Sequence, residues 1–173
     1  MQRVGFSLGG GRNMQKGLVD SMIVMDYDNA FEDAIEWWER QLEDGWELHI
    51  SQVSLMEMLK GIAKSPGSRE KAFNDFRFRI QEIRKEGKIR RIWPITQGIS
   101  KIAHSLLEQY CRRFTPPSWC ERMESLICDM LIAATALKHG LFLFTENLRD
   151  FQWIDSLRVE KVDYEIEGGG EMT

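Results

Sequence analysis

Cysteine and histidine are scarce in this chain of 173 residues, which contains three of each. The cysteines are an odd number without a close pair, so the sequence argues against a disulfide framework and against a structural zinc site. We therefore expect reduced thiols. The histidines stand singly without metal-ligand spacing, and we expect them at the surface or at the core boundary. These residues are Cys111, Cys120, Cys128, His49, His104 and His139.

Long apolar runs are also missing. No segment approaches the roughly 18 apolar residues needed to cross a membrane, and the N-terminus lacks the hydrophobic stretch of a signal peptide. We therefore expect a cytoplasmic protein without membrane contact. Gly9, Gly10 and Gly11 do not form a phosphate-binding loop, because no strand precedes them and no Lys-Ser/Thr pair follows.

An excess of positive charge is absent too. Lysine and arginine number 23 against 27 acidic residues, which gives a net charge of -4. This balance excludes a protein that holds nucleic acid by bulk positive charge. Local basic clusters remain, and they are the candidates for contact with a polyanion. One cluster contains Arg84, Lys85, Lys88, Arg90 and Arg91, and the other contains Arg112 and Arg113.

Short apolar segments alternate with segments of helical period along the chain. Strands are predicted at 17–25, 46–50, 88–95 and 141–145, with a further edge strand at 157–163. Helices are predicted at 29–44, 53–63, 68–86, 97–113 and 119–139. This alternation predicts an α/β fold with a mainly parallel sheet. We expect one folded domain over residues 14–163, a flexible extension over 1–13 and a flexible tail over 164–173.

Three acidic residues stand in apolar surroundings far apart in the sequence: Asp20, Glu57 and Asp129. A buried carboxylate is costly unless it is paired or bound to a cation. No histidine or cysteine accompanies the three, so a shared site would offer only oxygen ligands, which suit Mg²⁺ or Mn²⁺. Such an ion commonly acts on phosphodiesters. The alternative is that each acid caps a helix or forms a pair within the core.

Four segments of the sequence also match a known pattern, in order. Val19–Val24 resembles an apolar strand followed by Asp-Thr-Asn-Val/Ile, and Ser51–Gly61 resembles Ser-x-Val-Thr-x-x-Glu-Leu-x-x-Gly. Asp129–Ala136 resembles Asp-x-Leu-Ile-Ala-Ala-x-Ala, and Thr145–Phe151 resembles Thr-x-Asn-x-x-Asp-Phe. Together they resemble the PIN-domain ribonuclease family and its VapC-type toxins. Met22 departs from the first motif, where the family usually has Asn.

The resemblance implies a three-layer α/β/α PIN-like fold and an endoribonuclease that uses Mg²⁺ or Mn²⁺. It also implies an RNA substrate, a homodimer and a cognate antitoxin protein. The metal-binding acids would be Asp20, Glu57, Asp129 and Asp150. Asn147 would support the site, and Thr145 would orient a carboxylate or the attacking water.

Two other interpretations of the sequence remain open. Met22–Asp28 resembles the apolar run and Asp-x-Asp of haloacid-dehalogenase-type phosphatases, in which Asp26 would be the nucleophile and Asp28 the general acid/base. The second alternative is a non-catalytic PIN-like module that binds protein, which is consistent with the departure at Met22.

Overall fold

The computed structural model describes residues 14–64, 69–114 and 121–164. The predictions for the extension 1–13, the glycines at 168–170, the loop at 115–118 and Cys120 concern residues outside this description. The strands are β1 (Gln15–Val19), β2 (Trp46–Ser51), β3 (Arg91–Trp93), β4 (Phe142–Thr145) and β5 (Val159–Lys161). The helices are α1 (Ser21–Asp28), α2 (Glu32–Glu43), α3 (Gln52–Lys64), α4 (Arg69–Lys85), α5 (Gln97–Arg113), α6 (Glu121–His139) and α7 (Leu148–Phe151).

The five strands form one sheet in the order β3-β2-β1-β4-β5, and every neighbouring pair is parallel. The parallel sheet predicted from the alternation of segments is confirmed. The strand order reverses between β1 and β4, because the chain builds outward from β1 in one direction and then in the other. In open α/β sheets, ligands bind at such a reversal, beyond the carboxyl ends of the strands.

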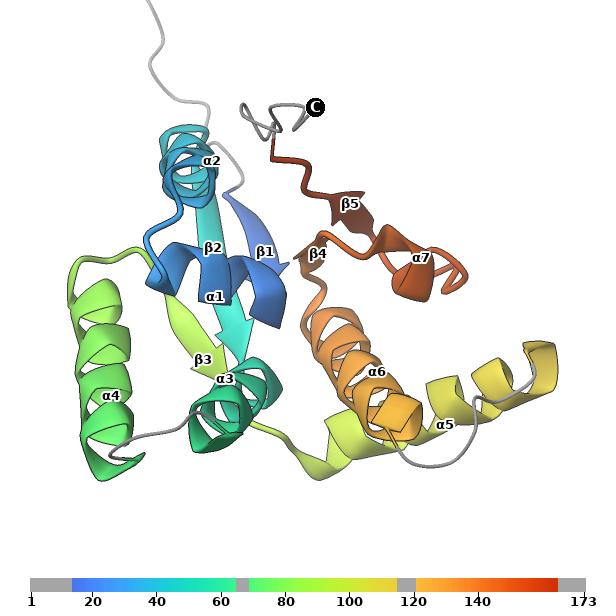
Figure 1. The fold of residues 1–173 in the computed structure, drawn as a ribbon. Coiled ribbons are helices and arrows are strands. Elements are labelled where there is room, and N and C mark those ends of the chain that lie inside the picture. Colours follow the sequence, from blue (N-terminus) through green and yellow to red (C-terminus); the bar gives the residue numbers. More distant parts are fainter. Residues whose placement is uncertain (1–13, 65–68, 115–120, 165–173) are drawn as a thin grey trace, which may run out of the picture.

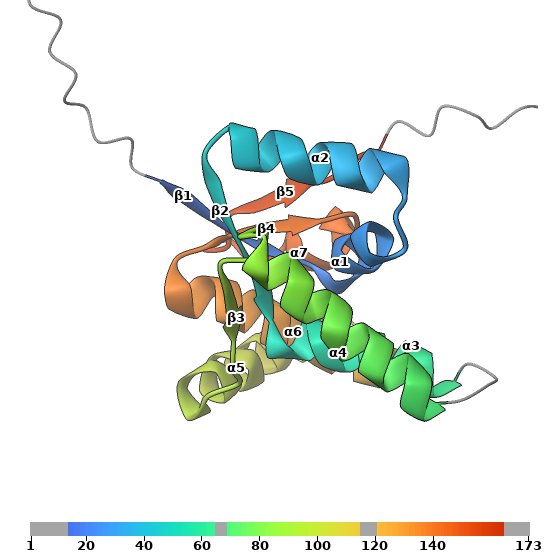
Figure 2. The same ribbon diagram turned by 90° about the vertical axis from the view of Figure 1, so that its left-hand side faces the viewer.

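Helices cover both faces of the sheet, as predicted for three layers (Figure 1). On one face, Leu18 and Leu143 of the strands pack with apolar residues of α5 and α6. On the other face, Val19 and Phe144 pack with residues of α1, α2 and α4, among them the fully buried Trp38. Figure 2 shows α4 and α2 in front of the sheet, seen from this second side. Alternate residues of β1 and β4 thus serve opposite cores, which explains their continuous apolar sequences.

The predicted strand at 17–25 is wrong in its second half. β1 ends at Val19, and the apolar residues from Met22 to Met25 belong to α1. The reason is the polar residue between the two elements: the Asp20 side chain accepts a hydrogen bond from the Ser21 N–H and caps the helix. A short apolar run fits a strand or a buried helix equally well, so periodicity alone could not separate them.

Several other boundaries also differ from the prediction. The helix expected over 29–44 starts only at Glu32, because the chain turns at Ala30, which has a positive φ of 59°. The strands expected at 88–95 and 157–163 contain only three residues each, Arg91–Trp93 and Val159–Lys161. The four-residue helix α7 was not predicted at all.

Gly17 lies at the centre of β1, between β2 and β4. A Cβ atom at this position would lie 2.3 Å from an atom of the Phe144 ring, well inside van der Waals contact. Phe144 is fully buried and its ring is enclosed by Trp37 and Trp46. Glycine therefore allows the aromatic side chains of the second core to lie directly on the backbone of β1.

The surface position predicted for the histidines is correct for His104 but wrong for His49, which is 3% exposed in β2. His139 is partly buried and stacks on Trp93 with 3.7 Å between ring centroids. Within the part of the chain that the structure describes, no helix has the length and apolar character required to pass through a bilayer.

Candidate active site

The candidate site lies at the carboxyl ends of β1 and β4, where the strand order reverses. Asp20 directly follows β1, and Thr145 is the last residue of β4. The Asp20 N–H donates to the Phe144 carbonyl over 3.0 Å, which extends the pairing of these strands by one residue. The ends of the two central strands therefore set the positions of both side chains.

The Asp20 carboxylate is held by donors from both strand ends. One oxygen accepts a hydrogen bond from the Ser21 N–H at 2.7 Å, and the other accepts one from the Thr145 hydroxyl at 2.7 Å. The Asn147 N–H in turn donates to the Thr145 oxygen at 3.0 Å, which leaves the hydroxyl proton directed at Asp20. Burial raises the pKa of Asp20, although these hydrogen bonds oppose the rise.

Glu57 comes from α3, on the side of β2. Its carboxylate accepts a 2.6 Å hydrogen bond from the Ser21 hydroxyl, and Ser21 thereby joins Glu57 to Asp20. Burial raises the pKa of Glu57, and the negative charge of Asp20 raises it further. The carboxylates predicted from two separate motifs thus lie within one hydrogen-bonded group.

Asp129 comes from the middle of α6 and is partly buried. Burial raises its pKa to about 8, and the charges of Asp20, Asp150 and Glu57 add to that rise. No ion pair or hydrogen bond holds its carboxylate within the described residues, so nothing in this part of the chain offsets the cost of its charge. Asp129 is therefore the acid of the site that most needs a cation.

Asp150 lies in α7 and completes the group. Its carboxylate accepts a hydrogen bond from the Asn147 side-chain amide. The negative charge of Asp150 contributes to the raised pKa of both Asp20 and Asp129. Hydrogen bonds, with Ser21 as one link, connect five of the six side chains selected from the sequence: Asp20, Glu57, Thr145, Asn147 and Asp150. Asp129 is related to them by its electrostatic interactions with Asp20, Asp150 and Glu57.

The chemistry of this group fits a hard divalent cation. The four acids offer only oxygen ligands, and the described residues contain no lysine or arginine ion-paired with any of them. As the side chains lie, no three acids, histidines or cysteines among the described residues are close enough together to hold a metal ion. Binding would therefore require the carboxylates to turn toward one another. A cation would relieve the repulsion that raises their pKa values.

Sequence reasoning missed three residues that border the site: Ser21, Cys128 and Glu146. Ser21 links two of the acids, and its place directly after Asp20 in the first motif could have drawn attention to it. Burial raises the pKa of the Cys128 thiol to about 11, and Glu57 and Asp129 contribute to the rise. Burial raises the pKa of Glu146 to about 7, and the neighbouring carboxyl group of Asp26 adds to the rise. The sequence carried no signal for the last two.

The arrangement required for the phosphatase alternative is not present. A nucleophilic Asp-x-Asp pair should follow a strand, whereas Asp26 and Asp28 lie inside α1. Asp28 forms a bidentate ion pair with Arg79 of α4, whose guanidinium donates hydrogen bonds of 2.6 and 2.8 Å to the two carboxylate oxygens. Asp28 is therefore a structural partner of α4, and this alternative is wrong.

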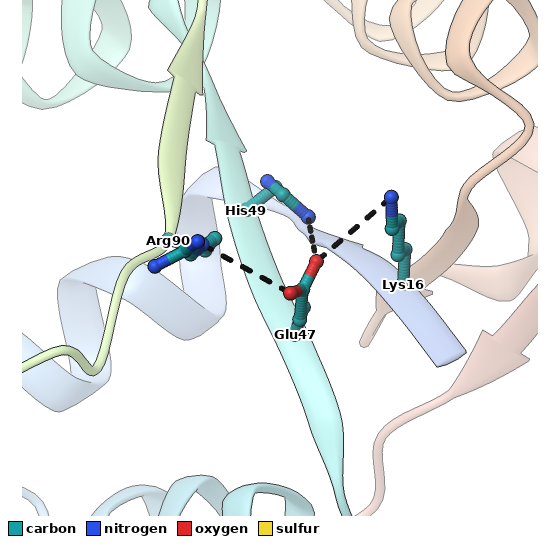
Figure 3. A network of polar contacts seen from close by, with 4 residues as sticks. All are labelled: Lys16, Glu47, His49 and Arg90. Carbon is teal, nitrogen blue, oxygen red and sulfur yellow. Dashed lines mark ion pairs between the residues drawn. The ribbon is translucent and has the colours of Figure 1, made fainter. Parts of the chain in front are cut away.

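The larger predicted basic cluster lies at the amino-terminal ends of the strands, around the end of α4 and the start of β3. We call this side of the sheet the amino-terminal edge, and the side with the acids the carboxyl-terminal edge. There Arg90, Lys16 and His49 surround the carboxylate of Glu47, with contacts of 3.9, 4.0 and 3.8 Å (Figure 3). Lys88 donates a 2.7 Å hydrogen bond to the Tyr27 hydroxyl. Because all strands are parallel, this edge is opposite to the acids. The smaller cluster, Arg112 and Arg113, ends α5 on the side of α7.

Comparison with known families agrees with this geometry. A family model described as the PIN domain matches residues 18–156, which is most of the chain. The chain belongs to the PIN-domain family. The matched range begins just before Asp20 and extends beyond Asp150, so it includes every acid of the candidate site. It also lies within the domain predicted over 14–163, whose outer limits stay a prediction. A search among curated protein sequences found no match.

Solved structures show the same fold for this PIN domain. A chain in the crystal structure of VapBC2 from Rickettsia felis, bound to a promoter DNA fragment, has a TM-score of 0.64 and 18% identity, with 86% of this chain and 100% of that chain covered. A chain of DNA-bound VapBC from Salmonella typhimurium has a TM-score of 0.62 and 22% identity, covering 86% and 98%. A chain of FitAcB from Neisseria gonorrhoeae has a TM-score of 0.61 and 18% identity, covering 83% and 95%.

Proposed function

We propose that this PIN-domain protein is a metal-dependent endoribonuclease that hydrolyses phosphodiester bonds of RNA. The observation that carries the proposal is that four carboxylates from separate elements interact electrostatically at the reversal of the strand order, each without a paired cation in the described structure. Such a concentration of unpaired acids costs stability, and function is the usual reason to retain it. Membership of the PIN-domain family supports nuclease activity as that function.

Mg²⁺ or Mn²⁺ would be held by Asp20, Glu57, Asp129 and Asp150. When bound, such an ion positions and activates a water molecule and neutralises charge on the phosphodiester. The protein's own contribution is to aim the ligands. The Thr145 and Ser21 hydroxyls orient the carboxylates of Asp20 and Glu57. Asp129 must release a proton before it can act as a ligand, because its pKa is about 8 without a cation.

We further propose that the protein is the toxin of a toxin–antitoxin pair and forms a homodimer. The similar solved structures include VapBC complexes and a toxin–antitoxin complex from Klebsiella pneumoniae, which supports a cognate antitoxin as a partner. An apolar hollow of about 200 Å³ between α5 and α6, with the exposed Ile127 at its edge, supports a protein contact on that side.

Cleavage of RNA by the purified protein tests the enzymatic proposal. Wild type with Mn²⁺ or Mg²⁺ should cut labelled single-stranded RNA, and EDTA should abolish the cleavage. Asp129→Asn should lower the rate by about 10³-fold or more, because it removes a charged ligand. If wild type cuts no RNA with either ion over a panel of sequences, the protein is a non-catalytic PIN-like module instead.

Expression in bacterial cells tests the toxin proposal separately. Induction of wild type should arrest growth, whereas induction of Asp129→Asn should not. Co-expression of a small protein encoded by the neighbouring gene should restore growth and should co-purify with the chain. Growth arrest by both forms would contradict toxicity through RNA cleavage. Light scattering of the purified chain measures whether it is a dimer.

A further inference from the structure

A group of aromatic side chains lies beside the acids and takes no part in the site described above. Tyr110 and Phe114, at the end of α5, meet Trp153, which follows α7. Their ring centroids are 4.8 to 6.0 Å apart, and Phe114 is 42% exposed. We call Tyr110, Phe114, Trp153 and Arg113 the aromatic platform.

The aromatic platform is attached directly to the acidic site. The Trp153 indole N–H donates a 2.8 Å hydrogen bond to the backbone carbonyl of Asp150. Arg113 donates a 3.0 Å hydrogen bond to the Trp153 carbonyl, and its guanidinium lies 5.8 Å from the centroid of the Trp153 ring. The end of α5 is therefore joined to α7 at the helix that carries an acid of the site, and both helices lie on one side of the molecule in Figure 1.

Exposed arginines belong to the aromatic platform or adjoin it in the sequence, although the chain has a net charge of -4. Arg112 is exposed and precedes Arg113, which remains 48% exposed with the Asp155 carboxylate at 3.8 Å. Arginine and aromatic rings together form the surface on which unpaired nucleobases stack while the guanidinium contacts phosphate. Aromatic and arginine side chains are also common where proteins meet, but the hydrogen bond from Trp153 to Asp150 ties this group to the acids proposed to cut RNA, which favours RNA as the occupant.

We propose that the aromatic platform binds an unpaired base of the RNA chain that enters the acidic site, with the base stacked on Phe114. The proposal rests on the proposed nuclease function and adds a binding site to it: an exposed aromatic side chain, tied to Asp150, that holds a base of the RNA near the cut. A base-paired residue keeps its faces covered by its neighbours, so it cannot stack on a side chain without being unstacked first.

The affinity of a labelled single-stranded RNA for a protein that cannot cut it tests this proposal. The Asp129→Asn protein serves as background, so that binding is measured without cleavage. In it, Phe114→Leu should raise Kd by roughly 5- to 100-fold, because it keeps the apolar surface but removes the aromatic face. Phe114→Trp should keep the affinity. Phe78→Leu is the matched control, since Phe78 is 62% exposed on α4, away from the platform.

An RNA that lacks one base identifies the stacking itself. The oligonucleotides of a series each lack the base at one position. Loss of the base at one of these positions should weaken binding to the Asp129→Asn protein. The same loss should have little effect on binding to the protein that carries both Asp129→Asn and Phe114→Leu. Equal Kd values for the two proteins on every oligonucleotide would overturn the proposal. So would a change from dimer to monomer on Phe114→Leu without a change in Kd, because the platform would then be a protein contact. Cleavage by wild type judges the nuclease proposal separately, since it can persist when either result appears.

Discussion

The two edges of the sheet use carboxylates in opposite ways. At the amino-terminal edge, Glu47 has the cations Lys16 and Arg90 within 4.0 Å, and the buried His49 lies 3.8 Å away as a neutral imidazole, because its pKa is lowered to about 4. At the carboxyl-terminal edge, Asp20 and Asp129 have raised pKa values and no ion pair within the described residues. A structural acid thus has cationic partners within the fold, whereas a functional acid still requires a cation from outside it.

Replacement of one acid at each edge by its amide should give the largest difference in RNA-cleavage rate between the two edges. Glu57→Gln should lower RNA cleavage by about 10²-fold or more, because it removes a proposed metal ligand. Glu47→Gln should leave cleavage within about twofold of wild type and should instead lower the free energy of unfolding by about 1 kcal/mol, as one partner of a part-buried charged group is lost. Rates measured at saturating Mn²⁺, with urea unfolding of each variant, check both. Equal loss of activity in both variants would show that the edges do not differ as described.

The metal-free protein should lose stability as pH rises, because of the acidic edge. The folded state holds the proton of Asp129 up to about pH 8, whereas the unfolded chain releases it near the ordinary value of 3.8. The unfolded state therefore binds fewer protons between these values, and stability falls by at most about 1.4 kcal/mol per pH unit. Thermal unfolding in EDTA between about pH 6.5 and 8 measures the slope. Asp129→Asn should flatten it, and a wild-type Tm that rises over this range would contradict the assignment.

The opposite edge should respond to acid instead. Burial lowers the pKa of His49 to about 4, so the folded state disfavours the charged imidazole that the unfolded chain forms below about 6.5. Stability should therefore fall as pH decreases through this window. His49→Phe removes the titration and should raise stability at about pH 5 by about 2 kcal/mol relative to wild type. His104→Phe, at an exposed position, is the control and should not change how stability falls with decreasing pH.

The smallest effect is expected from the basic cluster of the amino-terminal edge. Arg90→Gln should change RNA cleavage by less than about twofold, because Arg90 lies across the sheet from the acids and its nearest carboxylate is Glu47. Cleavage at low and moderate salt measures this. A marked loss of cleavage in Arg90→Gln that disappears at high salt would contradict this expectation. It would mean that the RNA extends to the amino-terminal edge and binds the basic cluster there.

The sequence predicted the parallel sheet correctly, because it depends on local patterns, and the acids selected as a site stand out by local patterns too. The apolar segments of β1 and β4 and the uncharged surroundings of Asp129 are visible in a single pass along the chain. The prediction was poorer where distant contacts decide the structure. Met22 to Met25 became a helix because Asp20 caps it, and His49 is buried by residues of other elements. The roles of the six selected residues stay predictions until the variants are measured.

Gly17 also determines where Asp20 can lie. A Cβ atom opposite the Phe144 ring would overlap it, so the observed register of β1 between its neighbours places a glycine where a side chain would displace the ring. A shift by two residues would keep the buried face inside but would bring Gln15 or Val19 to the ring and move Asp20 by about 6.6 Å along the sheet. The absence of a side chain at Gly17 thus favours the observed register of β1, and the position of Asp20 follows from that register.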